Sequence, residues 1–326
     1  MSFRSGKKKT MASISLDLDN QWSYMKIHGD PGWERFPSYL EILIPRVLDA
    51  LDLWQLKITF FIVGQDAAND KDQGVLKLLQ QRGHEIGNHS FHHEPWLYLY
   101  SKEQLKQEIL EAEGHILRVT GEKPVGFRGP GFTWSYDLMD LLSTAGYLYD
   151  ASTFPTYLGP LARIYYFWRS ELSKQEQNER KALFGSFKEG FRSVNPYFWQ
   201  TAGGRQILEI PVTTMPILKT PFHLSYLLYL SRFSEMLMLL YLQIAIGLCK
   251  VTRTAPSFLL HPLDFMGCDE VPALSFFPGM DLGSKRKMAL FHKVIGLLSR
   301  HYHLVSLGTY ATFIQTQSAT HMVLNN

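Results

Sequence analysis

Strands and helices alternate along the first 150 residues of this chain, and that alternation limits the folds that the chain can adopt. Residues 12–18 alternate apolar and polar as a strand does, residues 57–63 contain a short apolar run, and shorter strands suit residues 125–127 and 147–150. Strands that alternate with helices pair in parallel, because each helix returns the chain to the end of the sheet where the previous strand began. The pattern therefore predicts an α/β fold, with either an open parallel sheet or a closed barrel.

Capping and turn residues set the limits of several predicted elements. Pro45 suits the first turn of a helix, because its fixed φ and missing N–H cost least there. Ser101 and Gln104 form a capping box for a helix that ends at Gly121. Residues 21–38 are broken by glycines and prolines, so we expect a long loop there.

We predict a single domain over residues 12–315, with tails at residues 1–11 and 316–326. The strand–helix rhythm breaks at residues 156–204, where aromatic and basic residues mix, and we interpret this segment as a helical insertion. Residues 222–250 are the most apolar segment, but their longest uncharged run is about fourteen residues. Since a spanning helix needs about twenty apolar residues, this segment fits either a core helix or a helix at a membrane surface.

Composition restricts the compartment and the partners. The two cysteines, Cys249 and Cys268, exclude a disulfide framework and favour a reducing compartment. No apolar run follows the basic start of the chain before Asp17, so we predict no secretory signal and a cytoplasmic protein. The formal net charge of +3 is too small to indicate a nucleic-acid partner.

Two polar clusters follow predicted strands and suggest a metal site. His89 and His93 stand four residues apart, a spacing that can direct two imidazoles to one point. Asp17 and Asp19 end the first strand, and one carboxylate with two imidazoles makes a three-ligand site that leaves coordination positions open. The second carboxylate could then accept a proton. A hydrogen-bonded histidine cluster and an aspartate pair capping backbone amides are the alternatives.

Four motifs in this order resemble those of the polysaccharide deacetylases, carbohydrate esterases that share the NodB homology domain. They are the D-x-D stretch 17–19, the H-[ST]-x-x-H stretch 89–93, the Arg-Gly-Pro-Gly stretch 128–131 and the L-x-H stretch 259–261. The resemblance covers residues 12–315 apart from the insertion. It implies a distorted, incomplete (β/α)₇ barrel in which Asp19, His89 and His93 hold one divalent metal ion. The ion would be zinc, with cobalt or nickel in some members. His84 and His92 have no role in this scheme.

The resemblance also implies an acid and a base for amide hydrolysis. Asp17 would be the general base, oriented by Arg128, and His261 would be the general acid that protonates the leaving amine. The family's acidic residue that tunes the histidine is not evident here. Asp150 and Asp264 both remain candidates for it.

The resemblance implies a hydrolase that removes an acetyl or formyl group from an aminosugar. The insertion and the apolar segment lead us to expect a lipid-linked or glycolipid substrate, reached by peripheral contact with the inner face of the membrane. Two alternatives remain open. One is an allantoinase-like hydrolase of a small cyclic amide, and the other is a non-catalytic carbohydrate-binding module.

Overall fold

The computed structural model describes residues 9–158 and 187–324 and the side chains as far as residue 318. Its strands are β1 (Thr10–Asp17), β2 (Thr59–Ile62), β3 (Glu85–Asn88), β4 (Gly126–Phe127), β5 (Tyr149–Asp150), β6 (Tyr197–Gln200), β7 (Gln206–Glu209), β8 (Ser257–Leu260) and β9 (Tyr302–Val305). Its helices are α1 (Gln21–His28), α2 (Leu40–Asp52), α3 (Gly64–Ala68), α4 (Asp70–Gln81), α5 (Lys102–Thr120), α6 (Tyr136–Ala145), α9 (Leu224–Ser231), α10 (Glu235–Val251), α11 (Ser284–His301) and α12 (Leu307–Leu324).

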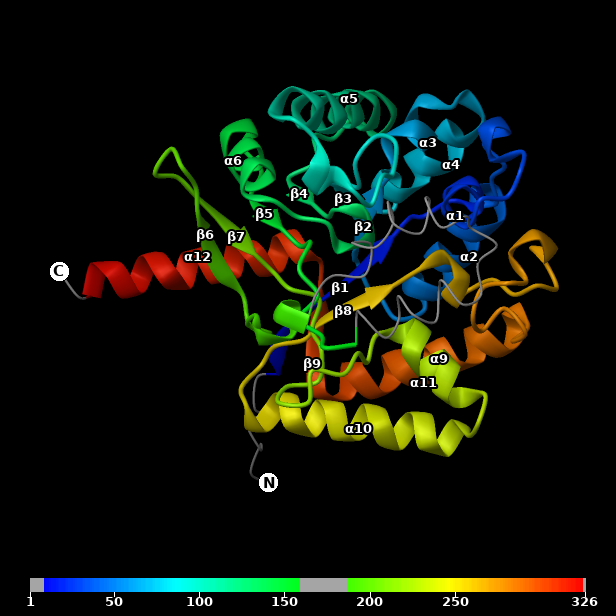
Figure 1. Ribbon diagram of the computed structural model, residues 1–326. Coiled ribbons are helices and arrows are strands. Elements are labelled where there is room, and N and C mark those ends of the chain that lie inside the picture. Colours follow the sequence, from blue (N-terminus) through cyan, green and yellow to red (C-terminus); the bar gives the residue numbers. More distant parts are fainter. Residues whose placement is uncertain (1–8, 159–186, 325–326) are drawn as a thin grey trace.

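The described strands form one curved sheet in the order β6-β7-β5-β4-β3-β2-β1-β8, and β9 also pairs with β1. All pairs are parallel except β6 with β7. The sheet does not close, because β8 and the antiparallel β6 lie at its two ends. Helices surround this sheet, with α3, α4 and α5 above it and α10 and α11 below it in Figure 1. The expected incomplete α/β barrel is confirmed.

The parallel register brings the loops after the strands to one edge. Asp17 lies opposite Phe61, and Leu16 lies opposite Leu260 on the other side of β1. Asn88 on β3 pairs with Phe127 on β4 in the same way. The polar residues that follow β1, β3, β4 and β8 therefore gather at the carboxyl edge of the sheet, where α/β folds build their sites.

The segment predicted as a loop at residues 21–38 begins instead with helix α1. Asn20 caps its start by accepting the N–H of Gln21, with a distance of 2.8 Å. Gly29 ends it in a left-handed conformation with φ of 94° and donates its N–H to the carbonyl of Met25. A glycine that was interpreted as a loop signal is therefore a helix C-cap.

Helix α2 begins at Leu40, five residues before the proline that was predicted to lie in its first turn. Its buried stripe of Leu40, Leu43, Ile44 and Val47 recurs with helical spacing on both sides of Pro45. Burial of this stripe outweighs the backbone hydrogen bond that Pro45 cannot donate.

The predicted insertion is only partly described, because residues 159–186 lie outside the described residues. Its described end contains a 3₁₀ turn at Phe187–Phe191 and then the strand β6, where amphipathic helices were expected. Trp199 on β6 is buried and packs with the cluster beneath α5 and α6. Aromatic residues at this position thus form an edge strand, and the part of the insertion in which helices could still occur lies outside the described residues.

The apolar segment forms α9, which packs on β8, and α10, which packs against α9 and α11. Leu224, Leu227, Met238 and Leu242 are buried in the main core, in line with the core-helix interpretation. The described part of the chain holds no helix with both the length and the apolar character needed to cross a bilayer. At the C-terminal end, α12 remains helical to Leu324, where a tail was predicted from residue 316.

Candidate metal centre

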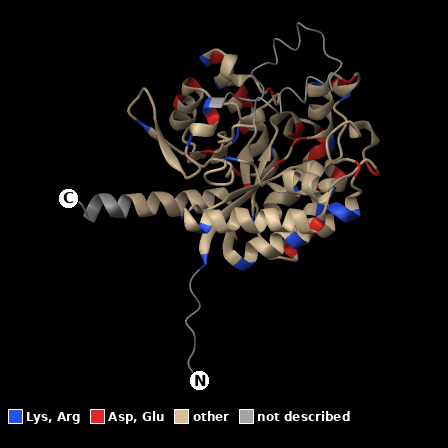
Figure 2. Cartoon of the chain, turned by 60° about the horizontal axis from the view of Figure 1, so that its bottom comes forward, with Lys and Arg blue, Asp and Glu red and all other residues tan. Residues whose placement is uncertain are grey.

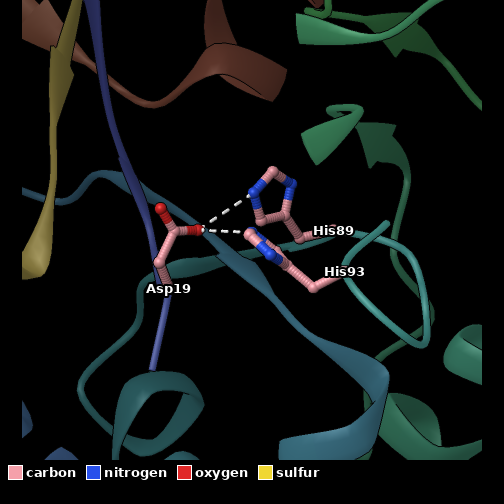
Figure 3. Close-up of side chains that lie close together, drawn as sticks. All are labelled: Asp19, His89 and His93. Atoms are coloured by element: carbon pink, nitrogen blue, oxygen red, sulfur yellow. Dashed lines mark hydrogen bonds and ion pairs between the residues drawn. The ribbon is translucent and has the colours of Figure 1, made fainter. Parts of the chain in front are cut away.

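Asp19, His89 and His93 converge at the carboxyl edge of the sheet. Asp19 comes directly after β1, and both histidines come from the loop that follows β3 (Figure 3). The Asp19 Oδ1 lies 2.9 Å from the Nε2 of His93 and 3.2 Å from the Nε2 of His89. Their donor atoms all lie within 4.8 Å of one another, the one such cluster of potential ligands in the part of the chain that the structure describes.

Backbone contacts fix the orientation of His89. Its Nδ1 lies 2.6 Å from the carbonyl oxygen of Arg128, so Nδ1 carries the proton and donates it. Its Nε2 faces Asp19, and once Nε2 gives up its proton it presents a lone pair to a cation at that point. Metal-ligating histidines commonly donate their second ring nitrogen in this way, which sets the tautomer and the ring orientation.

The carboxylate of Asp19 is held from several sides. Burial by itself raises the pKa of Asp19, but the charge of His93 and the hydrogen bonds from both histidines outweigh burial and hold this pKa well below its usual value. Tyr24 donates to Asp19 Oδ2 at 3.3 Å, and Tyr39 donates to the Asp19 carbonyl at 2.5 Å. Asp19 is therefore a positioned anion beside two imidazoles.

This donor set fits a divalent transition metal. One carboxylate oxygen and two imidazole nitrogens form the three-ligand arrangement typical of a catalytic zinc site with an open position. The Nε2 atoms of both imidazoles lie within 3.2 Å of the same oxygen of Asp19, so the three donor atoms converge on one point where a cation can bind. The residues present thus match the ligand set that the sequence predicted.

Asp17 and Arg128 form a buried ion pair next to this cluster. The Arg128 guanidinium is fully buried, and its Nη1 lies 2.6 Å from Asp17 Oδ1 and 2.8 Å from Ser15 Oγ. Its Nε donates to the carbonyl of Ala151 at 2.9 Å, and its face lies 4.4 Å from the centre of the Phe61 ring. These contacts fix one orientation of the guanidinium and, through it, of the Asp17 carboxylate.

His261 follows β8 and lies level with the end of β1, because Leu260 pairs with Leu16. Its Nδ1 lies 3.1 Å from the Oγ of Ser225 at the start of α9. Its Nε2 makes no hydrogen bond to any described residue. The ring of His223 lies 5.7 Å from the ring of His261, and burial holds the pKa of His223 well below its usual value, so His223 is neutral.

The two candidates for tuning His261 differ in position. Asp264 is buried, and its Oδ2 accepts the backbone N–H of His261 at 2.8 Å. Asp150 instead accepts the hydroxyl and the N–H of Ser152 and pairs across the sheet with Glu209. Only Asp264 touches His261.

Some residues around the site were missed from the sequence. Ser225 and His223 lie at the start of an apolar helix, and nothing in the local pattern separates them from a core segment. Glu108 carried a usable signal, since it stands between Leu105 and Ile109 on the buried face of α5. A charged residue at such a position indicates a specific partner.

Comparison with known proteins finds similarity to one family over part of the chain. Residues 30–149 match the family model for polysaccharide deacetylase. The peptidoglycan deacetylase of Helicobacter pylori is 26% identical over 152 residues, which cover 44% of this chain and 50% of that protein. Over residues 30–149 the chain is similar to the polysaccharide deacetylase family. The match to the family model includes His89, His93 and Arg128, and it begins after Asp17 and Asp19.

Solved structures support the deacetylase fold over nearly the whole chain. A polysaccharide deacetylase candidate from Mycobacterium smegmatis aligns with a TM-score of 0.57 and 17% identity, covering 98% of this chain and 94% of that one. A PuuE allantoinase aligns with a TM-score of 0.58 and 17% identity, covering 94% and 91%. At this identity the likeness concerns the fold alone, and the fold does not separate the two activities. The chain spans half or less of the length of the first curated relatives.

Proposed function

We propose that this chain is a metal-dependent hydrolase that removes an acetyl or formyl group from the nitrogen of an aminosugar. The observation that carries the proposal is the convergence of Asp19, His89 and His93 beside the buried pair of Asp17 and Arg128. Hydrolysis of an amide needs a group that polarises the carbonyl and a base that takes a proton from water. A metal ion held by the first three residues would supply the former, and the carboxylate of Asp17 would supply the latter.

In this proposal Asp19, His89 and His93 hold a divalent cation, which we take to be zinc. The cation would polarise the acyl carbonyl and make water more acidic. Asp17 then accepts the proton of the attacking water. Arg128 keeps the Asp17 carboxylate in one orientation and compensates its buried charge.

His261 completes the scheme as the acid that protonates the departing amine. An amine is a poor leaving group without that proton. The Ser225 hydroxyl holds the Nδ1 of His261, which leaves Nε2 to transfer a proton. Asp264 fixes the backbone of the same residue.

Names of relatives support an aminosugar as the substrate class. The matched proteins include the Helicobacter pylori peptidoglycan deacetylase and a chitooligosaccharide deacetylase of Sinorhizobium fredii, which is 32% identical over 106 residues. The substrates in both names carry N-acetylated amino sugars. We extend that class to this chain because its candidate site has the donor set for amide hydrolysis.

We further propose a lipid-linked aminosugar, approached from the cytoplasmic face of a membrane. The support is an apolar face on the outside of α10 and the turn before it. Met236 and Val251 are 79% and 80% exposed. The exposed apolar side chains of this face are Phe233, Met236, Leu237, Leu240, Ile244 and Val251. Contiguous exposed apolar surface of this kind usually marks an interaction site.

Charge selects an anionic lipid surface as the partner for this α10 face. Helix α11 packs beside α10, and its exposed charged residues are all basic: Lys285, Arg286, Lys293 and Arg300. Arg286 and Lys293 pair with Glu235 at the start of α10. Lys250 and Arg253 add exposed positive charge at the other end of α10. Figure 2 brings this side forward and shows long helices that are mostly tan, with basic residues and a few acidic ones near their ends. Apolar side chains flanked by Lys and Arg suit the interface of an anionic bilayer.

Deacylation of a defined panel tests the catalytic proposal. Purified protein loaded with zinc should release acetate or formate from N-acylated amino sugars, with faster turnover of lipid-linked forms, and chelation should stop the release. Turnover of allantoin-like cyclic amides without any turnover of aminosugars would contradict it.

Vesicle binding tests the membrane proposal separately. The protein should co-sediment with phosphatidylcholine vesicles containing phosphatidylglycerol, more weakly with phosphatidylcholine alone, and less at high salt. Leu240→Glu with Ile244→Glu should abolish binding, whereas Leu110→Glu with Leu117→Glu on the exposed face of α5 should not. Equal binding by both double variants would contradict the assignment of the α10 face. If the wild type forms a dimer and only the α10 double variant is monomeric, the α10 face is a contact between two copies of the chain.

A further inference from the structure

Glu108 is a carboxylate in an apolar environment. It lies on the face of α5 that also buries Leu105, Ile109 and Ala112, and only 4% of its surface is exposed. Burying a carboxylate costs several kcal/mol unless hydrogen bonds replace its water, so its partners account for its presence there.

Those partners all belong to the loop that carries the histidine ligands. Oε1 of Glu108 accepts the backbone N–H groups of Phe91 at 3.0 Å and His92 at 2.7 Å. Oε2 lies 2.8 Å from the Nδ1 of His92. Although burial raises the pKa of Glu108, the bonds from His92 outweigh burial and lower this pKa below its ordinary value, so the group is ionised.

The backbone of this loop is unusual on both sides of the bound amides. Ser90 has φ of 64° and His93 has φ of 55°, in the left-handed region that non-glycine residues seldom adopt. Each such residue costs of the order of 1 kcal/mol or more and persists where its surroundings hold it. Glu108 binds the two N–H groups that lie between these residues.

The opposite side of the loop is held by the start of α3. Gly64 donates its N–H to the carbonyl of Ser90 at 2.8 Å, and Gln65 donates to the carbonyl of Phe91 at 3.0 Å. The carbonyls are thus bound by one helix and the amides by the other. Both bonds to the amides come from the single side chain of Glu108.

We propose that Glu108 is a positioning residue that sets the conformation of residues 90–93 and thereby places His93 beside Asp19 for metal binding. The inference rests on the proposed metal site. Without the carboxylate, two amides lose their acceptor and the left-handed residues relax toward more common conformations. His93 then moves away from Asp19, and the site has to be reorganised each time it binds an ion.

Substitutions at Glu108 separate the effect of its geometry from that of its charge. Glu108→Gln keeps a side-chain oxygen at the same reach for the two amides and removes the charge. Glu108→Asp keeps the charge and withdraws the oxygens by one methylene. His92→Ala removes only the contact with Oε2 and leaves both backbone amides bound. Gln107→Ala, at the exposed neighbouring position of α5, is the control.

Zinc affinity, measured by competition with a chromophoric chelator, and the visible spectrum of the cobalt-loaded protein give the readout. We expect about 10- to 100-fold weaker binding and an altered cobalt spectrum for Glu108→Ala, the size typical when support of a ligand is lost. Glu108→Asp should approach that loss, Glu108→Gln should lose less than Glu108→Asp, and His92→Ala and Gln107→Ala should bind like the wild type.

Other results would contradict either the role of Glu108 or the metal site itself. Wild-type affinity and spectrum in both Glu108→Ala and Glu108→Asp would overturn the inference alone. A larger loss in Glu108→Gln than in Glu108→Asp would also overturn it, because charge and not reach would then matter. If Glu108→Ala does not fold, the order of Glu108→Asp and Glu108→Gln decides. Absence of metal binding in the wild type would overturn the proposed function and this inference with it.

Discussion

Two sets of carboxyl side chains at the same edge of the sheet, Asp19 in one and Asp150 with Glu209 in the other, have opposite pKa shifts. Asp19 faces two imidazoles, and its pKa is lowered because their charge and hydrogen bonds outweigh burial. Asp150 and Glu209 face each other on β5 and β7, and burial raises both of their pKa values. The first group keeps its charge and directs donor atoms to one point, whereas the second retains a proton and is satisfied by its own neighbours.

The neighbours of the second group explain why it is structural. Glu209 accepts the hydroxyl and the N–H of Thr153 on Oε1 and the indole N–H of Trp199 on Oε2. Asp150 accepts two bonds from Ser152. Carboxyl groups at a barrel edge are therefore not equivalent candidates for chemistry, and the partners of each one decide its role.

The largest effect should come from the ligands. His89→Ala combined with His93→Ala should remove metal binding and lower deacylation by at least about a thousandfold, because both proposed nitrogen donors are lost. Metal content and acyl release measure this. His84→Ala, a substitution of a buried histidine whose Nδ1 accepts the N–H of Ile58, should keep the metal. If the double variant kept its full metal content, Asp19 would not differ from Asp150 and Glu209 by binding a metal ion.

Arg128 lies between the two groups, and Arg128→Lys should have the next largest effect. Lysine keeps the charge but cannot bond to Asp17, Ser15 and the Ala151 carbonyl together. We expect kcat to fall about 100-fold, with zinc affinity changed less than about threefold. If zinc affinity and kcat fell together, Arg128 would support the metal ligands and not the orientation of Asp17.

The smallest effect concerns the pH dependence of stability at Glu209. A carboxyl group whose folded pKa is raised adds stability that is fully present below its unfolded pKa, near 4, and is lost as pH rises through the folded pKa. Glu209→Gln should therefore match the wild type near pH 4 and become the more stable protein as pH rises toward 8. Urea unfolding across this range measures the difference. A difference in unfolding free energy that does not change with pH would contradict the statement that Glu209 retains its proton in the folded protein.

The sequence predicted the metal group because its members lie close to strand ends. Asp19, His89 and His93 each follow a strand by a few residues, and parallel pairing alone brings such positions together. The choice of Asp19 as the ligand, and the roles expected of Arg128 and His261, came instead from the resemblance of their motifs to the polysaccharide deacetylases. Local signals also gave helix α5 its limits, since the Ser101 and Gln104 capping box and the Gly121 cap are all present.

Contacts between elements that lie far apart in the chain could not be predicted from the sequence. Glu209 depends on Trp199 from a strand inside the predicted insertion, and His261 depends on Ser225 from an apolar helix. The limits of α1 and α2 were mistaken because Gly29 and Pro45 were weighed by local preference. Tertiary burial and capping decided both helices instead.

The central claim is that Asp19, His89 and His93 hold a metal ion, and anomalous X-ray diffraction at the zinc edge from zinc-loaded crystals tests it most directly. We predict a peak about 2.0–2.2 Å from a carboxylate oxygen of Asp19 and from the Nε2 atoms of His89 and His93. A zinc peak at another site, with none between these three side chains, would contradict the account.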